Sequence, residues 1–143
     1  MGRLLAIDYG QRRCGIAVTD PLRIVATALA TVPTPQLIPY ITAYVAREEV
    51  DEIVVGHPTT LDGRPSDSMR YITPGINRLR KVIPPEIRIV YYDERFTSAL
   101  AHQAMLDSGM HRMQRRDKAV VDRMAATIIL NEYLQSKSYT DNK

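Results

Sequence analysis

The sequence is poor in cysteine and has no long run of apolar residues. Cys14 is the single cysteine among 143 residues, so one chain can form neither a disulfide nor a thiolate metal site. No stretch approaches the roughly 18 uninterrupted apolar residues of a membrane span, and the first residues lack the pattern of a signal peptide. A Walker glycine loop and a nucleophile-elbow serine are also missing. We therefore expect a soluble protein of the reducing cytoplasm with no membrane contact.

What the chain does contain is typical of one folded domain, with 45% hydrophobic and 24% charged residues. The net charge of +3 is too small to indicate a nucleic-acid partner by itself. Positive charge is concentrated in residues 111–118, which hold four basic residues and one acid, and in the pair Arg12-Arg13. These segments are either solvated basic loops or contacts for a polyanion.

Apolar periodicity predicts strands first and alternating helices and strands afterwards. Thr34, followed by a proline, is predicted to cap the first helix. The predicted strands cover 3–7, 14–19, 24–31, 52–56 and 87–92, and the predicted helices 34–49, 67–82, 97–109 and 117–134. This order indicates an α/β fold, with a mixed sheet and helices on both faces. We expect one domain over residues 1–136 and a frayed tail over 137–143.

Carboxylates follow two of the predicted strands. Asp8 ends the first strand, and Asp93-Glu94 follows the strand at 87–92. In α/β sheets ligands collect at the carboxyl ends of parallel strands, which makes these positions candidates for chemistry. Only one of Asp93 and Glu94 can face the same side as Asp8, and alternation along the strand leaves both open. The alternative role for Asp8 is to cap the turn that follows it.

A third carboxylate, Asp122, lies beside the packing face of the last predicted helix, where an unpaired charge is costly. An ordinary ion pair with Lys118, four residues earlier, is the alternative. Asp117 is rotated by about 140° from Asp122 on a helix and is better explained as a cap. Three converging carboxylates suit one or two Mg²⁺ or Mn²⁺ ions, which support phosphodiester cleavage.

A polyanionic substrate would need cations around such a site. The candidate substrate-binding residues are Arg12, Arg13, Arg95, Thr97, Arg115, Arg116 and Lys118. The histidines, His57, His102 and His111, lack metal-ligand spacing and are interpreted as structural. Cys14 lies in a predicted strand and is expected in the core.

Four ordered blocks that together span nearly the whole chain resemble the YqgF family, also called RuvX. They are Ala6–Val18 with Asp8, Gly10 and Gly15; Gly56-His57-Pro58 with Leu61-Asp62-Gly63; Asp93-Glu94-Arg95 with Thr97-Ser98; and Lys118–Asp122. The resemblance implies a ribonuclease H-like fold with a mixed five-stranded sheet, related to the Holliday junction resolvase RuvC. It also implies an acidic metal-binding and catalytic triad of Asp8, Glu94 and Asp122. His57 departs from the family pattern, which usually has an aliphatic residue there, and the family's Asn or basic residue near Thr60 is also missing.

The activity implied by the resemblance is that of a metal-dependent nuclease that matures the 5′ end of pre-16S ribosomal RNA. The expected partners are pre-rRNA first, branched DNA second, and ribosomal particles. The expected oligomeric state is a monomer or a weak homodimer, since junction resolution needs two symmetric cuts and end-processing does not.

Three other functions are alternatives to RNA cleavage. The same family resemblance allows a Holliday junction resolvase acting on DNA. A nucleic-acid or ribosome-binding module without catalysis is disfavoured by the intact triad. The glycines that follow Asp8 also resemble the first phosphate loop of actin-like and sugar-kinase ATP-binding proteins. That class needs two such lobes around the nucleotide, and 143 residues provide one.

Overall fold

The computed structural model describes residues 2–57, 68–93 and 118–141; for Asp93, 118–123 and 136–141 it describes the backbone. The strands are β1 (Arg3–Tyr9), β2 (Arg13–Thr19), β3 (Ala26–Pro33), β4 (Val50–His57) and β5 (Arg88–Asp93). The helices are the 3-10 helix η1 (Thr34–Gln36), α1 (Leu37–Arg47), α2 (Met69–Val82) and α5 (Lys118–Asp141). The predicted helix at 97–109 lies outside the described residues.

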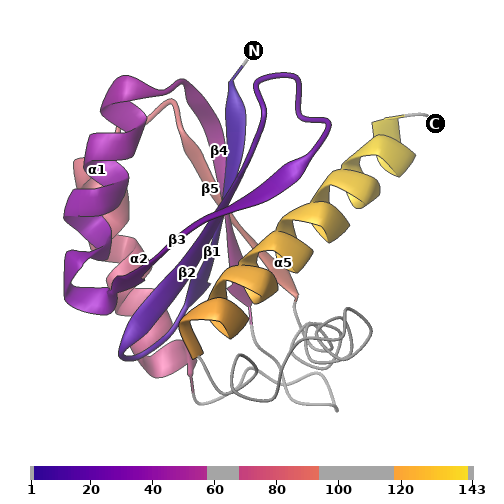
Figure 1. Ribbon diagram of the computed structural model, residues 1–143. Helices are drawn as coiled ribbons and strands as arrows, with labels where there is room; N and C mark the ends of the chain where they lie inside the picture. The colour runs from indigo at the N-terminus through magenta and orange to yellow at the C-terminus, as the bar shows by residue number, and fades with distance from the viewer. Residues whose placement is uncertain (1, 58–67, 94–117, 142–143) are drawn as a thin grey trace.

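The strands form a mixed five-stranded sheet in the order β3-β2-β1-β4-β5. The hairpin pairs β1–β2 and β2–β3 are antiparallel, and the crossover pairs β1–β4 and β4–β5 are parallel. Helices α1 and α2 cover one face of the sheet and α5 crosses the other (Figure 1). The predicted mixed sheet with helices on both faces is confirmed.

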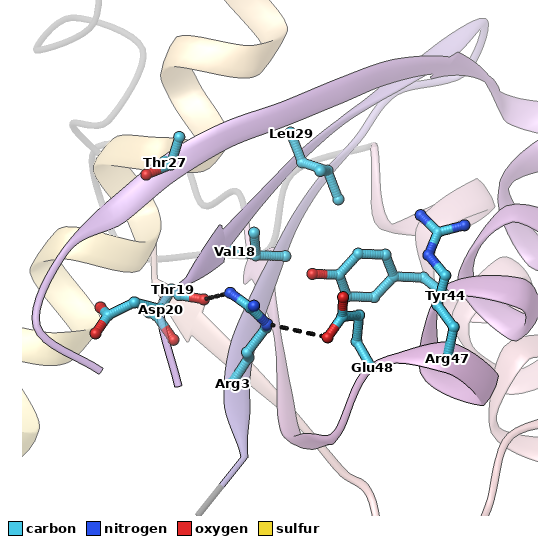
Figure 2. Close-up of a pocket in the computed structure, with 9 residues that line it drawn as sticks. All are labelled: Arg3, Val18, Thr19, Asp20, Thr27, Leu29, Tyr44, Arg47 and Glu48. Carbon is cyan, nitrogen blue, oxygen red and sulfur yellow. Dashed lines mark hydrogen bonds and ion pairs between the residues drawn. The ribbon is translucent and has the colours of Figure 1, made fainter. Parts of the chain in front are cut away.

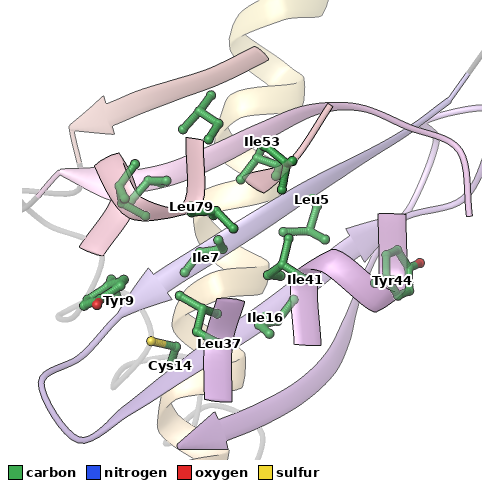
Figure 3. Close-up of a cluster of buried hydrophobic side chains, with 14 of the residues drawn as sticks. Leu5, Ile7, Tyr9, Cys14, Ile16, Leu37, Ile41, Tyr44, Ile53 and Leu79 are labelled. Carbon is green, nitrogen blue, oxygen red and sulfur yellow. The ribbon is translucent and has the colours of Figure 1, made fainter. Parts of the chain in front are cut away.

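Each face of the sheet has its own apolar core, which explains why β1 and β4 are apolar nearly throughout. The core under α1 and α2 is built from large side chains, including Leu5, Ile7, Ile41 and Leu79 (Figure 3). On the opposite face, the smaller core under α5 contains Leu4, Ala6, Ala17, Val54, Ala126, Ile129 and Leu130. Three alanines in this second set let the helix approach the strands closely, because small side chains shorten the distance between packed backbones.

The end of the last helix differs from the prediction. The sequence predicted that this helix ends near Leu134, whereas α5 continues to Asp141. Residues 135–141 contain neither glycine nor proline, so nothing in the backbone interrupts the series of helical hydrogen bonds. The spacing of apolar residues predicts which part of a helix packs against the core, and it does not predict where the helix ends beyond that part.

A polar contact between α5 and β4 accompanies the apolar packing. The Tyr133 hydroxyl donates a hydrogen bond to the carboxylate of Glu52, which is only 4% exposed. Burial, reinforced by the hydrogen bond and charge of Glu52, raises the pKa of Tyr133 well above its usual value. The phenol therefore stays protonated as the donor at neutral pH.

Stability should fall at alkaline pH because of this contact. The contribution of a group with a raised folded-state pKa is fully present below its unfolded pKa, about 10 for tyrosine, and is lost as pH rises through the folded value. The free energy of unfolding should therefore decline above about pH 10. The Tyr133→Phe variant should have a free energy of unfolding about 1 kcal/mol lower than the wild type at pH 8. That free energy should also decline less steeply as pH rises. Urea unfolding between pH 8 and 11 measures the free energy of unfolding and its change with pH. An equally steep decline in the two proteins would contradict this role of Tyr133.

Candidate active site

Asp8 lies at the carboxyl end of the central strand β1, on the face covered by α5. Side chains of a strand alternate between its faces. Ile7 belongs to the core under α1 and α2, whereas Ala6 belongs to the core under α5. Asp8 shares the alternation of Ala6 and is half-buried. Its partner on the antiparallel strand is Gly15, which adds no side chain beside the carboxylate.

The carboxyl ends of the parallel strands meet at the same edge of the sheet as Asp8. Ile7 of β1 is in register with Val55 of β4, and His57, two residues further, is in register with Asp93 of β5. The chain thus leaves β5 at the edge where Asp8 stands. Such an edge is the usual ligand site of an open α/β sheet.

Helix α5 begins near this edge and runs towards the opposite one (Figure 1). Ala126 packs in the core under α5, and Tyr133 further along contacts Glu52 towards the amino end of β4. The first turns of α5 therefore lie on the Asp8 side of the sheet. Position 122 comes four residues before Ala126, which is about one helical turn.

Several predicted site residues lie outside the described part of the chain: Glu94, Arg95, Thr97, Arg115 and Arg116, as well as His102 and His111. For Asp122 and Lys118 the structure describes the helical backbone. Among the residues it describes, no three His, Cys, Asp or Glu side chains form a group able to hold a metal ion. Glu94 and the side chain of Asp122 are not among these described groups.

The first arginine pair lies in and directly after the β1–β2 turn, which follows the strand end that carries Asp8. Arg12 is exposed, and Arg13 is the half-buried first residue of β2. Together with Gly10 and Gln11 they line a shallow pocket of about 250 Å³. A β-carbon at Gly10 would lie 2.3 Å from the Arg13 carbonyl oxygen, so the turn requires glycine there.

His57 and Cys14 have structural environments, in agreement with the sequence prediction. His57 shares the alternation of Val55, which packs in the core under α1 and α2, and therefore lies on the face away from Asp8. Its ring makes an edge-to-face contact with Tyr91 at 5.7 Å between centroids. Cys14 is fully buried.

A larger pocket of about 420 Å³ lies at the opposite, amino edge of β1 (Figure 2). Its charged side chains are mostly engaged with the protein itself. Arg3 donates to the Thr19 carbonyl oxygen at 2.9 Å and pairs with Glu48 at 3.6 Å, and Arg47 lies over the ring of Tyr44. Two arginines face two carboxylates in the lining, so no excess charge selects an ionic ligand.

Sequence reasoning misassigned one residue near the site. Thr34 was predicted to cap the first helix, but neither η1 nor α1 has a side-chain cap hydrogen bond. Its hydroxyl donates instead to the Gly10 carbonyl oxygen at 2.7 Å. A threonine ahead of a helix can either cap that helix or donate its hydroxyl to another carbonyl oxygen. The sequence does not show that the Gly10 carbonyl oxygen, just after β1, lies within hydrogen-bond distance of Thr34.

Comparisons with known proteins agree on one family. The family model RuvX, described as Holliday junction resolvase, matches residues 2–136. A protein of Phocaeicola vulgatus named "Putative pre-16S rRNA nuclease" is 55% identical over 97% of this chain and 99% of its own length. A protein of the same name from Parabacteroides distasonis is 48% identical over the same shares of the two chains.

A solved structure reproduces the fold at low sequence identity. The RuvC protein of T. thermophilus, determined in complex with a Holliday junction substrate, aligns with a TM-score of 0.56 over 96% of each chain at 12% identity. This likeness and the sheet order show a ribonuclease H-like fold, and the matched family places the chain among the hydrolases of phosphodiester bonds. This chain belongs to the RuvX family. No helix in the described ranges is long and apolar enough to cross a membrane.

Proposed function

We propose that this protein is a divalent-metal-dependent nuclease whose metal ligands are Asp8, Glu94 and Asp122. The observation that carries the proposal is the position of Asp8. A half-buried carboxylate stands at the carboxyl edge of the central strand, on the face where the last helix begins. Of the other two proposed ligands, Glu94 directly follows β5 in the chain and Asp122 belongs to α5.

Strand alternation supports Glu94 rather than Asp93. Val90 and Tyr92 pack against the core under α5, whereas Ile89 belongs to the opposite core. An extended chain continued beyond β5 would carry position 94 to the face of Val90 and Tyr92, which is also the face of Asp8. Position 93 would follow the face of Ile89.

Helical periodicity supports Asp122. Ala126 and Ile129, which pack against the sheet, follow position 122 by four and seven residues. These spacings place the three positions on one stripe of a helix. Asp122 is thus the residue of that stripe one turn closer to the Asp8 edge.

The donor set fits Mg²⁺ or Mn²⁺, which prefer carboxylate oxygens and keep bound waters. A bound ion would supply an activated water and charge stabilisation at the leaving oxygen. The three carboxylates would hold the ions, and Arg12 and Arg13 would contact substrate phosphates beside them. Arg95, Thr97, Arg115, Arg116 and Lys118 complete the proposed substrate surface.

We propose pre-16S ribosomal RNA, processed at its 5′ end in the cytoplasm and on ribosomal particles, as the first substrate. The names of the most similar relatives support this choice. The description of the matched family supports branched DNA as the second candidate. We expect a monomer or a weak homodimer, because processing of one RNA end does not need two symmetric cuts.

A cleavage assay on both substrates tests the proposal. The purified protein should cut a pre-16S fragment in Mg²⁺ or Mn²⁺ and should cut a synthetic four-way DNA junction at least tenfold more slowly, a difference of about 1.4 kcal/mol in activation free energy. EDTA should abolish both activities. Preference for the junction would favour the resolvase, whereas cleavage that survives EDTA would exclude the metal mechanism.

A further inference from the structure

Thr34 holds both sides of the turn that follows the strand of Asp8. Its hydroxyl donates to the Gly10 carbonyl oxygen at 2.7 Å, and its backbone N–H donates to the Arg12 carbonyl oxygen at 3.0 Å. Thr34 is half-buried and belongs to η1, far from the turn in sequence. One residue from outside the hairpin thus fixes the beginning and the end of the segment 10–12.

The turn depends on such outside support. The β1–β2 ladder ends at the pair Tyr9–Cys14, so the segment 10–12 lies beyond the last pair of strand residues. Gln11 and Arg12 are both exposed and gain little from packing. Without a tether, a short polar turn of this kind samples several conformations.

The thiol of Cys14 contributes to the same contact. Its sulfur lies 3.5 Å from the Thr34 hydroxyl oxygen and 3.9 Å from the Gly10 carbonyl oxygen. Because Cys14 is fully buried, the hydroxyl is held between the carbonyl and a fixed core residue. This arrangement restricts the rotation of the Thr34 side chain.

We propose that Thr34 is a positioning residue that presents Arg12 to the substrate. The inference rests on the proposed nuclease function, because it takes a phosphate near Asp8 as the group that Arg12 contacts. In this role Thr34 acts through the backbone and not through contact with the substrate or the metal. It sets the path of the backbone that carries Arg12, so an anion meets a guanidinium that is already in place.

Removing the hydroxyl tests the proposal. Thr34→Val keeps the shape and the backbone N–H, and it should weaken binding of a labelled pre-16S fragment in EDTA by about three- to tenfold, the effect of one hydrogen bond. Thr34→Ser should restore the affinity. Thr42→Val is the matched control, because it removes a hydroxyl bonded at 2.7 Å to the Ile38 carbonyl oxygen within α1. It should leave binding unchanged.

A double-mutant cycle separates positioning from a general structural role. In an Arg12→Ala background, Thr34→Val should cause no further loss of RNA affinity, because the residue that it positions is gone. An equal loss in both backgrounds would overturn the inference, and so would equal binding by Thr34→Val and the wild type. Failure of the wild type itself to cut the fragment in Mg²⁺ or Mn²⁺ would overturn the proposed function, and this inference with it.

Discussion

Asp8→Asn should lower kcat/KM for the RNA fragment by roughly a thousandfold, equivalent to about 4 kcal/mol of lost transition-state stabilisation. The amide has nearly the size of the carboxylate but carries no charge, so it holds a divalent cation poorly. Metal titration by calorimetry should show a parallel loss of Mn²⁺ affinity. The strand itself should be unaffected, because the substitution changes neither the backbone nor the volume.

Asp20→Asn is the matched control for Asp8. The Asp20 carboxylate accepts backbone hydrogen bonds from Ile24 and Val25, both at 2.8 Å, in the β2–β3 turn at the opposite edge of the sheet. These bonds lower its pKa, so its role is to hold the turn. Cleavage by Asp20→Asn should stay within about twofold of the wild type, and a loss equal to that of Asp8→Asn would contradict a specific role of Asp8.

Stability without metal distinguishes a functional Asp8 from a structural one. If three carboxylates converge, Asp8→Asn relieves repulsion and should leave the free energy of unfolding in EDTA unchanged or raised. Urea denaturation provides this measurement. A large loss of stability would instead indicate that Asp8 serves the turn that follows it.

Ile129→Ala should lower the free energy of unfolding by about 2–5 kcal/mol. The Ile129 side chain extends from α5 into the core against the sheet and is fully buried. Its truncation leaves a cavity, because a helix that packs along the whole sheet cannot shift to fill it. The same change should weaken Mn²⁺ binding by about tenfold, because a loosened α5 holds Asp122 less firmly. Urea denaturation and metal titration at a temperature where the variant stays folded measure the two effects.

Ile76→Ala separates helix packing from general destabilisation. Ile76 is also fully buried, but it lies in α2 on the other face of the sheet. Its truncation should cost a similar free energy of unfolding and leave Mn²⁺ affinity nearly unchanged. Equal metal affinities for the two variants would show that α5 does not position a metal ligand.

The sheet was predictable because its pattern is local. Runs of apolar and β-branched residues predicted all five strands. The predicted order of elements along the chain placed strands joined directly before strands joined through helices. In the structure the first group pairs antiparallel and the second pairs parallel. The boundaries were less accurate, since β4 begins at Val50 and the sequence predicted Glu52.

The residues around the proposed site were predictable only in part. Asp8 could be placed at a strand end from the apolar run before it, but its face of the sheet depends on where α5 packs. The hydroxyl of Thr34 finds its acceptor 24 residues earlier in the chain, which no local pattern encodes. The choice between Asp93 and Glu94 came from the family resemblance, and strand alternation now supports it independently.

The order of elements along the chain has a consequence for biosynthesis. Among the described elements, β1 leaves the ribosome before the others, and α5 follows after all of them. The hairpins can pair early, as domains begin to form from their amino-terminal part during synthesis. Of the described helices, α5 is the one that covers the face of the sheet that holds Asp8, and it emerges after the strands. A nascent chain that already carries Asp8 would therefore still lack Asp122, so a nuclease built in this way would acquire its activity only after α5 has been synthesised.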